Sequence, residues 1–326
     1  MSNSHDNFNP FEQMTFTNDR CFLCGEILHD NNRTVEHVFP KWLQHKYNLW
    51  DKKLQLLNQS LFRYRQLTIP CCKECNQALN NKIEVPVCNA VNLGYKGVAD
   101  LDQRVLFLWL NKIAYGILFR ELSLRVDIKD PKSESIYSAE NLKKHQMQFI
   151  FLRSAILDAE FIYNPWSILL FRLDSRKHEK YWSFNSPFLK CFFIRVDDVG
   201  IIANLMDNGI QQEYFMEYED MRSLLGEILH PLQFAELCAK ILYKTSLFFR
   251  TPYYTIIFDN EKSPKTIISH PIGGDAFDTW DQKHYASILA EFIKPWKIPV
   301  KDFYQGDDQV ITYLRNNDGT FMQMIE

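Results

Sequence analysis

Apolar and polar residues follow a helical period in some segments of this chain and a strand period in others. Between residues 101 and 125, apolar side chains recur with helical spacing, and further apolar residues beside this stripe predict a helix buried on more than one side. A polar stretch over 127–140 precedes a second helical run over 146–159. Pro231 suits the first turn of a third helix, which continues through Phe234, Leu237 and Ile241.

Short runs rich in β-branched and aromatic residues, separated by turn residues, predict strands in the second half of the chain. These runs are Ser167–Leu173, Phe188–Val196, Tyr253–Phe258 and Thr266–Ser269. Because they interleave with helical patterns, we predict a mixed α/β body over residues 96–326 with a role in recognition or regulation. Its large aromatic residues are expected in the core: Trp166, Tyr181, Trp182, Phe192 and Phe193.

The N-terminal part has a different pattern. Residues 1–19 are polar and offer little to bury, so we expect a flexible arm. Residues 20–95 hold clustered Cys, His and Asn residues with few long apolar runs, and such a segment needs a metal for stability. Within it we predict a strand over 34–39 that ends at Pro40, a helix over 41–47 and a helix over 76–83. The predicted fold class is α+β, with a small metal-stabilised domain before the larger mixed body.

Two Cys-x-x-Cys pairs lie in the N-terminal segment: Cys21 with Cys24, and Cys72 with Cys75. Each pair presents two thiolates on one turn, and two such turns complete a tetrahedral site that suits Zn²⁺. Gly25 fits the first turn because glycine tolerates positive φ. Cys71 adjoins Cys72, but only Cys72 has the two-residue spacing to Cys75. The remaining cysteines lie in apolar runs and are expected in the core: Cys88, Cys191 and Cys238.

The composition is that of a folded globular protein: 326 residues, 46% hydrophobic and 14% aromatic. The formal net charge is −3, so contact with nucleic acid requires a local basic surface, and residues 30–82 offer nine Lys and Arg against four Asp and Glu. No secretory signal is visible, and the longest apolar stretch, 105–119, is too short to cross a bilayer of about 30 Å. We expect a cytoplasmic protein without a membrane partner, in which clustered cysteines stay reduced and bind metal.

The residues between and around the cysteine pairs resemble the zinc-ribbon branch of the HNH (ββα-metal) endonuclease family. The similarity rests on the order Cys-x-x-Cys, then Glu36-His37-Val-Phe-Pro40, then Pro70-Cys-Cys-Lys-Glu-Cys-Asn76, and covers about residues 20–84. In that family an acidic residue and a histidine commonly open the motif, followed by an apolar pair and proline. The later cysteine pair commonly ends in Cys-Asn or Cys-His. The resemblance implies a zinc-stapled ββα-metal domain over residues 20–95.

The resemblance also implies roles for three residues. His37 is expected as the general base, and Glu36 and Asn76 as ligands of a catalytic Mg²⁺ or Mn²⁺, beside a structural Zn²⁺ on the four cysteines. The residue chemistry agrees, because a neutral histidine can take a proton from water at neutral pH and a hard cation needs few protein oxygens beside its own waters. The implied substrate is DNA, and RNA stays open.

One departure from the family pattern concerns the residue that orients the catalytic histidine. The family often carries an asparagine nine residues before the last ligand, and here that position is Leu67, whose side chain cannot orient an imidazole. Thr68, Asn58 or a backbone carbonyl are the open alternatives. The sequence therefore leaves the orienting residue unassigned.

The predicted function is a metal-dependent endonuclease that hydrolyses phosphodiester bonds. Two-domain proteins with such an N-terminal nuclease are common in bacterial defence against foreign DNA, which implies a defence-system protein partner or a homo-oligomer. The alternative is a non-catalytic zinc-ribbon module that binds nucleic acid or protein. His45 is expected at the surface of a helix, and Glu84 can brace the last helix or approach the metal. No phosphate-loop or Gly-x-Ser-x-Gly motif occurs, so nucleotide hydrolysis and serine hydrolase chemistry have no support.

Overall fold

The computed structural model describes residues 17–130, 132–174, 176, 178–259, 263–304, 306 and 309–324. Of the predicted flexible arm, residues 1–16 lie outside this range. The chain forms two compact units: the first contains Met1–Asn92, Asp100–Ile162 and Tyr254–Ile268, and the second contains Leu93–Ala99, Tyr163–Tyr253 and Ser269–Glu326. The first unit is therefore larger than the predicted 20–95 segment, because later helices pack against the N-terminal strands.

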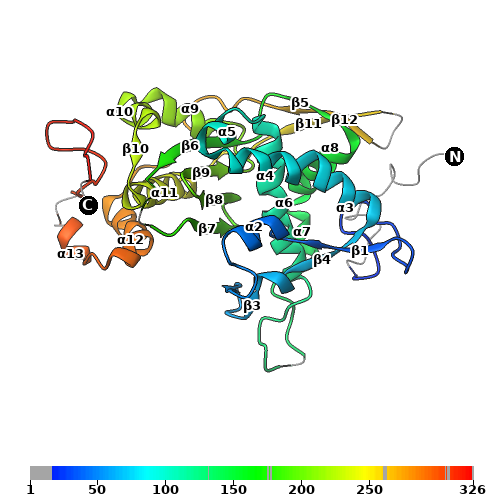
Figure 1. Ribbon diagram of the computed structural model, residues 1–326. Coiled ribbons are helices and arrows are strands. Elements are labelled where there is room, and N and C mark those ends of the chain that lie inside the picture. The colour runs from blue at the N-terminus through cyan, green and yellow to red at the C-terminus, as the bar shows by residue number, and fades with distance from the viewer. Residues whose placement is uncertain are drawn as a thin grey trace. The chain divides into compact units, whose positions relative to one another are not determined.

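The first unit is built on an antiparallel pair of strands, β1 (Arg33–His37) and β4 (Thr68–Cys72), followed directly by helix α3 (Lys73–Leu79) (Figure 1). The segment between the strands contains α2 (Lys41–Lys46), a small antiparallel pair of β2 (Lys53–Gln55) with β3 (Leu61–Arg63), and the 3₁₀ turn η2 (Tyr64–Gln66). The predicted strand over 34–39 and helix over 41–47 are confirmed, each ending slightly earlier than predicted.

Helix α3 continues into a π-helical turn, η3 (Asn80–Glu84), and then into α4 (Val85–Asn92). It begins earlier than predicted, because the Cys72 sulfur accepts a hydrogen bond from the Cys75 N–H and caps the helix. The unit also contains α6 (Gln103–Glu121), α7 (Ala139–Lys143) and α8 (Gln146–Leu157). A parallel pair of β5 (Glu160–Ile162) and β12 (Ser263–Ser269), extended by β11 (Tyr254–Asp259), completes it.

Helix α6 is the centre of the first unit, in contact with β4, η3, α4 and α8. Almost all of its side chains are buried, as the broad apolar stripe predicts. Gly116 allows this helix to approach the strands closely, since a Cβ there would lie 3.1 Å from Val38. Asn111 donates a hydrogen bond of 2.7 Å to the Gln148 carbonyl and joins α6 to α8.

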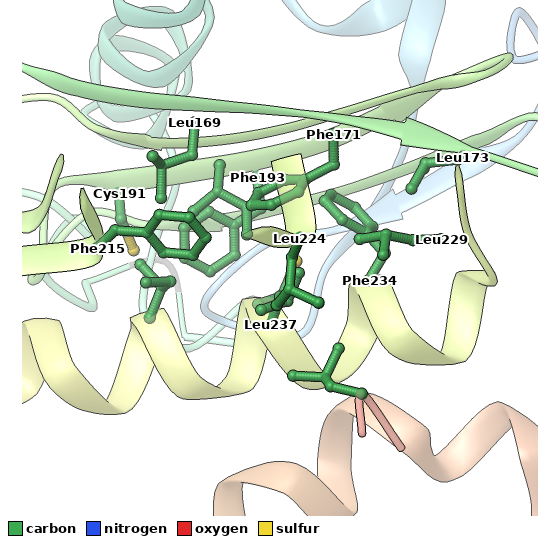
Figure 2. Packing of buried hydrophobic residues seen from close by; sticks show 14 residues of the cluster. Leu169, Phe171, Leu173, Cys191, Phe193, Phe215, Leu224, Leu229, Phe234 and Leu237 are labelled. Atoms are coloured by element: carbon green, nitrogen blue, oxygen red, sulfur yellow. The ribbon is translucent and has the colours of Figure 1, made fainter. Parts of the chain in front are cut away.

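The second unit contains a five-stranded sheet in the order β10 (Ile228–Leu229), β6 (Ser167–Leu173), β9 (Val199–Asn204), β8 (Cys191–Val196) and β7 (Tyr181–Ser186). Helix α11 (Pro231–Ser246) packs on one face, and Figure 2 shows Phe171 and Phe193 from the strands meeting Phe234 and Leu237 from this helix. A Cβ at Gly200 of β9 would lie 2.5 Å from the Phe234 ring, so this contact requires glycine.

The remaining elements of the second unit are helical: α5 (Gly94–Ala99), α9 (Ile210–Glu217), α10 (Glu219–Arg222), η4 (Ser223–Gly226), α12 (Gln282–Ile293), η5 (Lys294–Trp296) and α13 (Val300–Phe303). The predicted helices over 101–125 and 146–159 and the helix beginning at Pro231 are confirmed, as are the four predicted strands. Trp166, Phe192 and Phe193 are buried as predicted, whereas Tyr181 and Trp182 are half-buried.

The fold class is mixed α+β, as predicted. Among the helices of the described residues, none combines the length and the apolar character needed to cross a bilayer.

Candidate metal centre and the neighbouring acid–histidine pair

Four buried cysteines from both ends of the N-terminal segment come together: Cys21, Cys24, Cys72 and Cys75. Their sulfur atoms all lie within 4.8 Å of one another, and 3.7 Å separates the sulfurs of Cys24 and Cys72. Hydrogen bonds from the nearby cysteine thiols, first that of Cys24, lower the pKa of Cys21. Hydrogen bonding with Cys21 in turn raises the pKa of Cys24 and of Cys75. Four such sulfurs are a donor set for a structural metal such as Zn²⁺, whose charge would hold all of them as thiolates.

Local backbone geometry builds this four-cysteine cluster. Gly25 has φ of 76° and its N–H donates to the Cys21 carbonyl at 2.9 Å, which closes the first turn as predicted. The Phe22 N–H donates to the Pro70 carbonyl at 2.9 Å and joins this turn to β4. The second pair lies where β4 becomes α3, so the cluster connects the strand pair to the helix.

The choice of Cys72 over Cys71 is confirmed, because Cys72 belongs to the group and Cys71 does not. Cys71 lies next to it, fully buried, and hydrogen bonding with Cys21 raises its pKa. Cys191 and Cys238 are buried in the core of the second unit as predicted. The prediction for Cys88 is wrong: its side chain is partly exposed on α4, because the apolar run that contains it is an amphipathic helix with one face open.

Glu36 and His37 are consecutive residues at the end of β1, paired with Ile69 and Thr68 of β4. Glu36 is buried at 6% exposure, and His37, the last residue of the strand, is half-buried. The His37 ring lies 5.8 Å from the Trp50 ring, and the exposed His45, which is on a helix surface as predicted, stacks on the same tryptophan at 4.7 Å.

A buried lysine, Lys112 of α6, binds the acidic residue of this pair. Its ammonium forms an ion pair with Glu36 Oε1 and another with Glu84 Oε1 at 2.6 Å. It also donates to the backbone carbonyls of His37 at 2.6 Å and Val38 at 3.3 Å. These four oxygens surround the ammonium, and we call them the oxygen cage of Lys112.

Burial raises the pKa of the Glu36 carboxyl to about 7, and the Lys112 ammonium opposes that rise. Burial alone would lower the pKa of Lys112, but the carboxylates of Glu36 and Glu84 raise it above its usual value. Lys112 is therefore charged at neutral pH. A buried charge is stable only with close partners, which the oxygen cage provides.

Asn76 comes to Glu36 from the first part of α3. Its Nδ2 donates to Glu36 Oε2 at 3.0 Å and to the Val35 carbonyl at 3.2 Å. Both partners are acceptors, so the amide must present Nδ2 to them, and its oxygen Oδ1 is left for another ligand. The structure thus brings Asn76, the residue after Cys75, into contact with Glu36, while His37 follows Glu36 at the end of the strand pair away from Cys72. Glu36 and Asn76 carry oxygen atoms of the kind that bind a hard divalent cation.

His37 is neutral at physiological pH, because burial lowers its pKa to about 4 and the charges of Lys41 and Lys112 act in the same direction. Its Nδ1 atom is buried and has no hydrogen-bond partner among the described residues. No orienting residue predicted from the sequence binds this ring. Leu67 is fully buried and its carbonyl accepts from the Val38 N–H, while Asn58 is bonded to Ser60 and the Arg125 carbonyl.

The positive residues of the 30–82 segment are mostly at the surface. Lys41, Lys52, Lys53, Arg63 and Lys73 are exposed, whereas Arg65 pairs with Asp51 and Lys82 pairs with Asp158. Lys41 lies at the start of α2, close enough to His37 to affect its pKa. A cation in that place is suited to contact a phosphate near the histidine.

Two residues of the site were not predicted from the sequence as binding partners of the pair: Lys112, and Glu84, whose role was left open. The available signal was the polar pair Asn111–Lys112 inside an otherwise apolar helix, since both side chains are fully buried. Glu84 ends the π-helical turn η3, an element that is frequent at functional sites.

Comparison with known proteins adds no relative from which a family could be assigned: no protein-family model, no curated protein and no solved structure matches this chain.

Proposed function

We propose that the protein is an HNH-type endonuclease that hydrolyses DNA with a divalent metal ion. The observation that carries this proposal is the contact of Glu36 with Asn76, with His37 next to Glu36, on a strand–strand–helix unit that also holds four clustered cysteines. In this proposal the cysteines bind a structural Zn²⁺, and Glu36 and Asn76 bind Mg²⁺ or Mn²⁺. The second unit would recognise the target or regulate cleavage, alone or with a partner.

The proposed reaction assigns one task to each side chain. Neutral His37 accepts a proton from water, whose oxygen attacks the phosphorus while the bond from phosphorus to the leaving oxygen breaks. A bound divalent ion supplies charge neutralisation at the phosphate and at the leaving oxygen. Glu36 and Asn76 contribute oxygen ligands, and exposed Lys41 contacts the phosphate backbone. The half-buried position of His37 keeps its ring neutral and still allows a substrate to approach.

A plasmid-nicking assay tests this function. Supercoiled DNA is incubated with the protein and Mg²⁺ or Mn²⁺, and wild type is compared with His37→Ala and with the exposed His29→Ala as a matched control. We expect His37→Ala to slow nicking by about 10²- to 10⁴-fold, the usual contribution of a general base, and His29→Ala to leave the rate unchanged. Equal rates for His37→Ala and wild type would reject the assigned mechanism.

The competing function is a non-catalytic zinc-ribbon module that binds nucleic acid or protein. The observation in its favour is the buried Nδ1 of His37, which has no hydrogen-bond partner among the described residues, so no such residue selects the tautomer of the ring through that atom. Absence of cleavage of both DNA and RNA with either metal, together with retained binding, would favour this module over the nuclease.

A further inference from the structure

Four oxygens enclose a lysine ammonium in the first unit. Lys112 is fully buried, and the oxygen cage around its Nζ comes from two separate segments of the chain, the end of β1 and the end of η3. Enclosing a charge in this way is costly unless every contact is well made. A hydrophobic residue would serve a purely structural purpose in the middle of α6 at lower cost, as Leu110 and Ile113 do.

We propose that Lys112 is the positioning residue of the Glu36–His37 pair, and that Glu84 is the counter-charge that holds Lys112 in place. This inference rests on the proposed nuclease function. Lys112 takes the orienting task that the sequence could not assign to Leu67, Thr68 or Asn58. Lys112 lies on α6, 75 residues after His37 in the chain. It contacts the carboxylate of Glu36 and the backbone of His37, and it does not contact the imidazole.

The contacts of Lys112 restrict both residues of the pair at once. Glu36 Oε1 binds Lys112 and Glu36 Oε2 binds Asn76, so the carboxylate is held in one orientation. A second lone pair on Oε2 remains for the metal ion, next to the Asn76 amide that would be the other ligand. The carbonyl of His37 binds the same ammonium. Because that contact fixes the backbone of the residue that carries the imidazole, it also helps to hold the ring beside Trp50.

Helix α6 is held firmly enough to serve as the base of this contact. Gly116, one turn after Lys112, lies against Val38 and Ile69 of the strand region with almost no free space. Asn111, the residue before Lys112, is bonded to α8 through the Gln148 carbonyl. The lysine therefore reaches Glu36 from a fixed backbone, as a positioning residue requires.

The charges of the cage also suit a neighbouring cation site. With both carboxyls ionised, Glu36 and Glu84 carry two negative charges against the one positive charge of Lys112, which gives the group a net charge of −1. Lys112 removes the repulsion between two buried carboxylates and leaves enough negative charge to attract a divalent cation. Because the ammonium is fully buried, it has no contact with substrate, and its effect must pass through Glu36 and the backbone of His37.

The test is a double variant, Lys112→Met with Glu84→Gln, which removes the two charged side chains of the cage other than Glu36 and leaves the formal charge of the chain unchanged. The matched control is Lys82→Met with Asp158→Asn, which removes an exposed ion pair of the same unit. Three quantities are measured: zinc content, Mn²⁺ affinity by electron paramagnetic resonance of the free ion, and plasmid nicking over a range of Mn²⁺ concentrations. Helix content by circular dichroism reports folding.

We expect the Lys112–Glu84 double variant to keep its zinc and helix content, and its Mn²⁺ dissociation constant to rise about 10- to 100-fold, the usual effect of removing a group that supports a metal ligand. Nicking should fall at low Mn²⁺ and recover in part at saturating Mn²⁺, which a purely structural role would not produce. The control should match wild type in all three measurements.

If the folded double variant binds Mn²⁺ and nicks plasmid DNA as well as wild type does, the inference about Lys112 is wrong and the nuclease function still stands. A wild-type protein that neither binds Mn²⁺ nor cleaves nucleic acid would overturn the proposed function and the inference together. The His37→Ala comparison separates these cases, because it depends on the nuclease function and not on Lys112.

Discussion

A buried carboxyl on α6 should make the protein less stable as pH rises. Glu121 is only 1% exposed, and its Oε2 has no hydrogen-bond partner among the described residues. Burial raises the pKa of its carboxyl from 4.5 to about 7, and a hydrogen bond from the Leu57 N–H opposes this rise. A raised folded-state pKa means that the folded protein holds the proton more tightly than the unfolded chain. The stabilisation is complete below pH 4.5 and is lost as pH rises through 7.

The substitution Glu121→Gln removes the charge and keeps the shape. Relative to wild type, we expect the variant to gain roughly 1.5 kcal/mol of unfolding free energy at pH 5.5 and roughly 3 kcal/mol at pH 8, from about 1.4 kcal/mol per unit of pKa difference. The assay is urea unfolding at a series of pH values, with the exposed Glu160→Gln as control. The reasoning is refuted if the gain of Glu121→Gln is the same at pH 5.5 and pH 8.

Three further predictions concern other parts of the chain. Cys75→Ser should reduce bound zinc from about one ion per chain and destabilise the first unit, measured by metal analysis and thermal unfolding; full stability of a zinc-free protein would contradict the four-cysteine site. Gly200→Ala should cost about 1–3 kcal/mol in urea unfolding through its clash with Phe234, and Phe234→Leu should restore part of it; an unchanged Gly200→Ala midpoint would contradict the close contact. Asp207→Ala should cost about 1–3 kcal/mol, because Ser167 and the N–H groups of Gly209 and Gln211 lose their acceptor; thermal stability equal to wild type would contradict this.

Periodicity predicted the elements of the fold wherever one strong pattern governed a segment. The bounds of Ser167–Leu173 coincide with β6, whereas the predicted strand at Phe188 begins only at Cys191. The difference has a local cause, since Lys190 has φ of 53° and lies in the turn between β7 and β8. Strand β9 was missed because Gly200 weakens its strand pattern, and that glycine is required by the ring of Phe234 from α11.

The cysteine spacing predicted the four-cysteine cluster because two short-range rules, a pair on one turn and a second pair to complete a tetrahedron, suffice to define it. The surroundings of Glu36 obey no such local rule. Lys112 meets it only because α6 packs on β4, and no spacing in the sequence encodes that contact. The sequence showed a polar residue inside an apolar helix, but not which acid it would neutralise.

The pairing of β1 with β4 has a consequence for the fidelity of folding. A shift of one residue in the register of β1 would take Glu36 away from Lys112 and Asn76, because such a shift turns every side chain of a strand to its other face. At the other end of the same strands, Cys71 pairs with Thr34 and Cys72 pairs with Arg33. Cys72 belongs to the four-cysteine cluster, so a metal ion bound there would fix this end of the strand pair. During synthesis β1 and β4 emerge before α6. Metal binding to the cysteines would therefore select the correct register of the strands before Lys112, whose contact with Glu36 requires that register, has been synthesised.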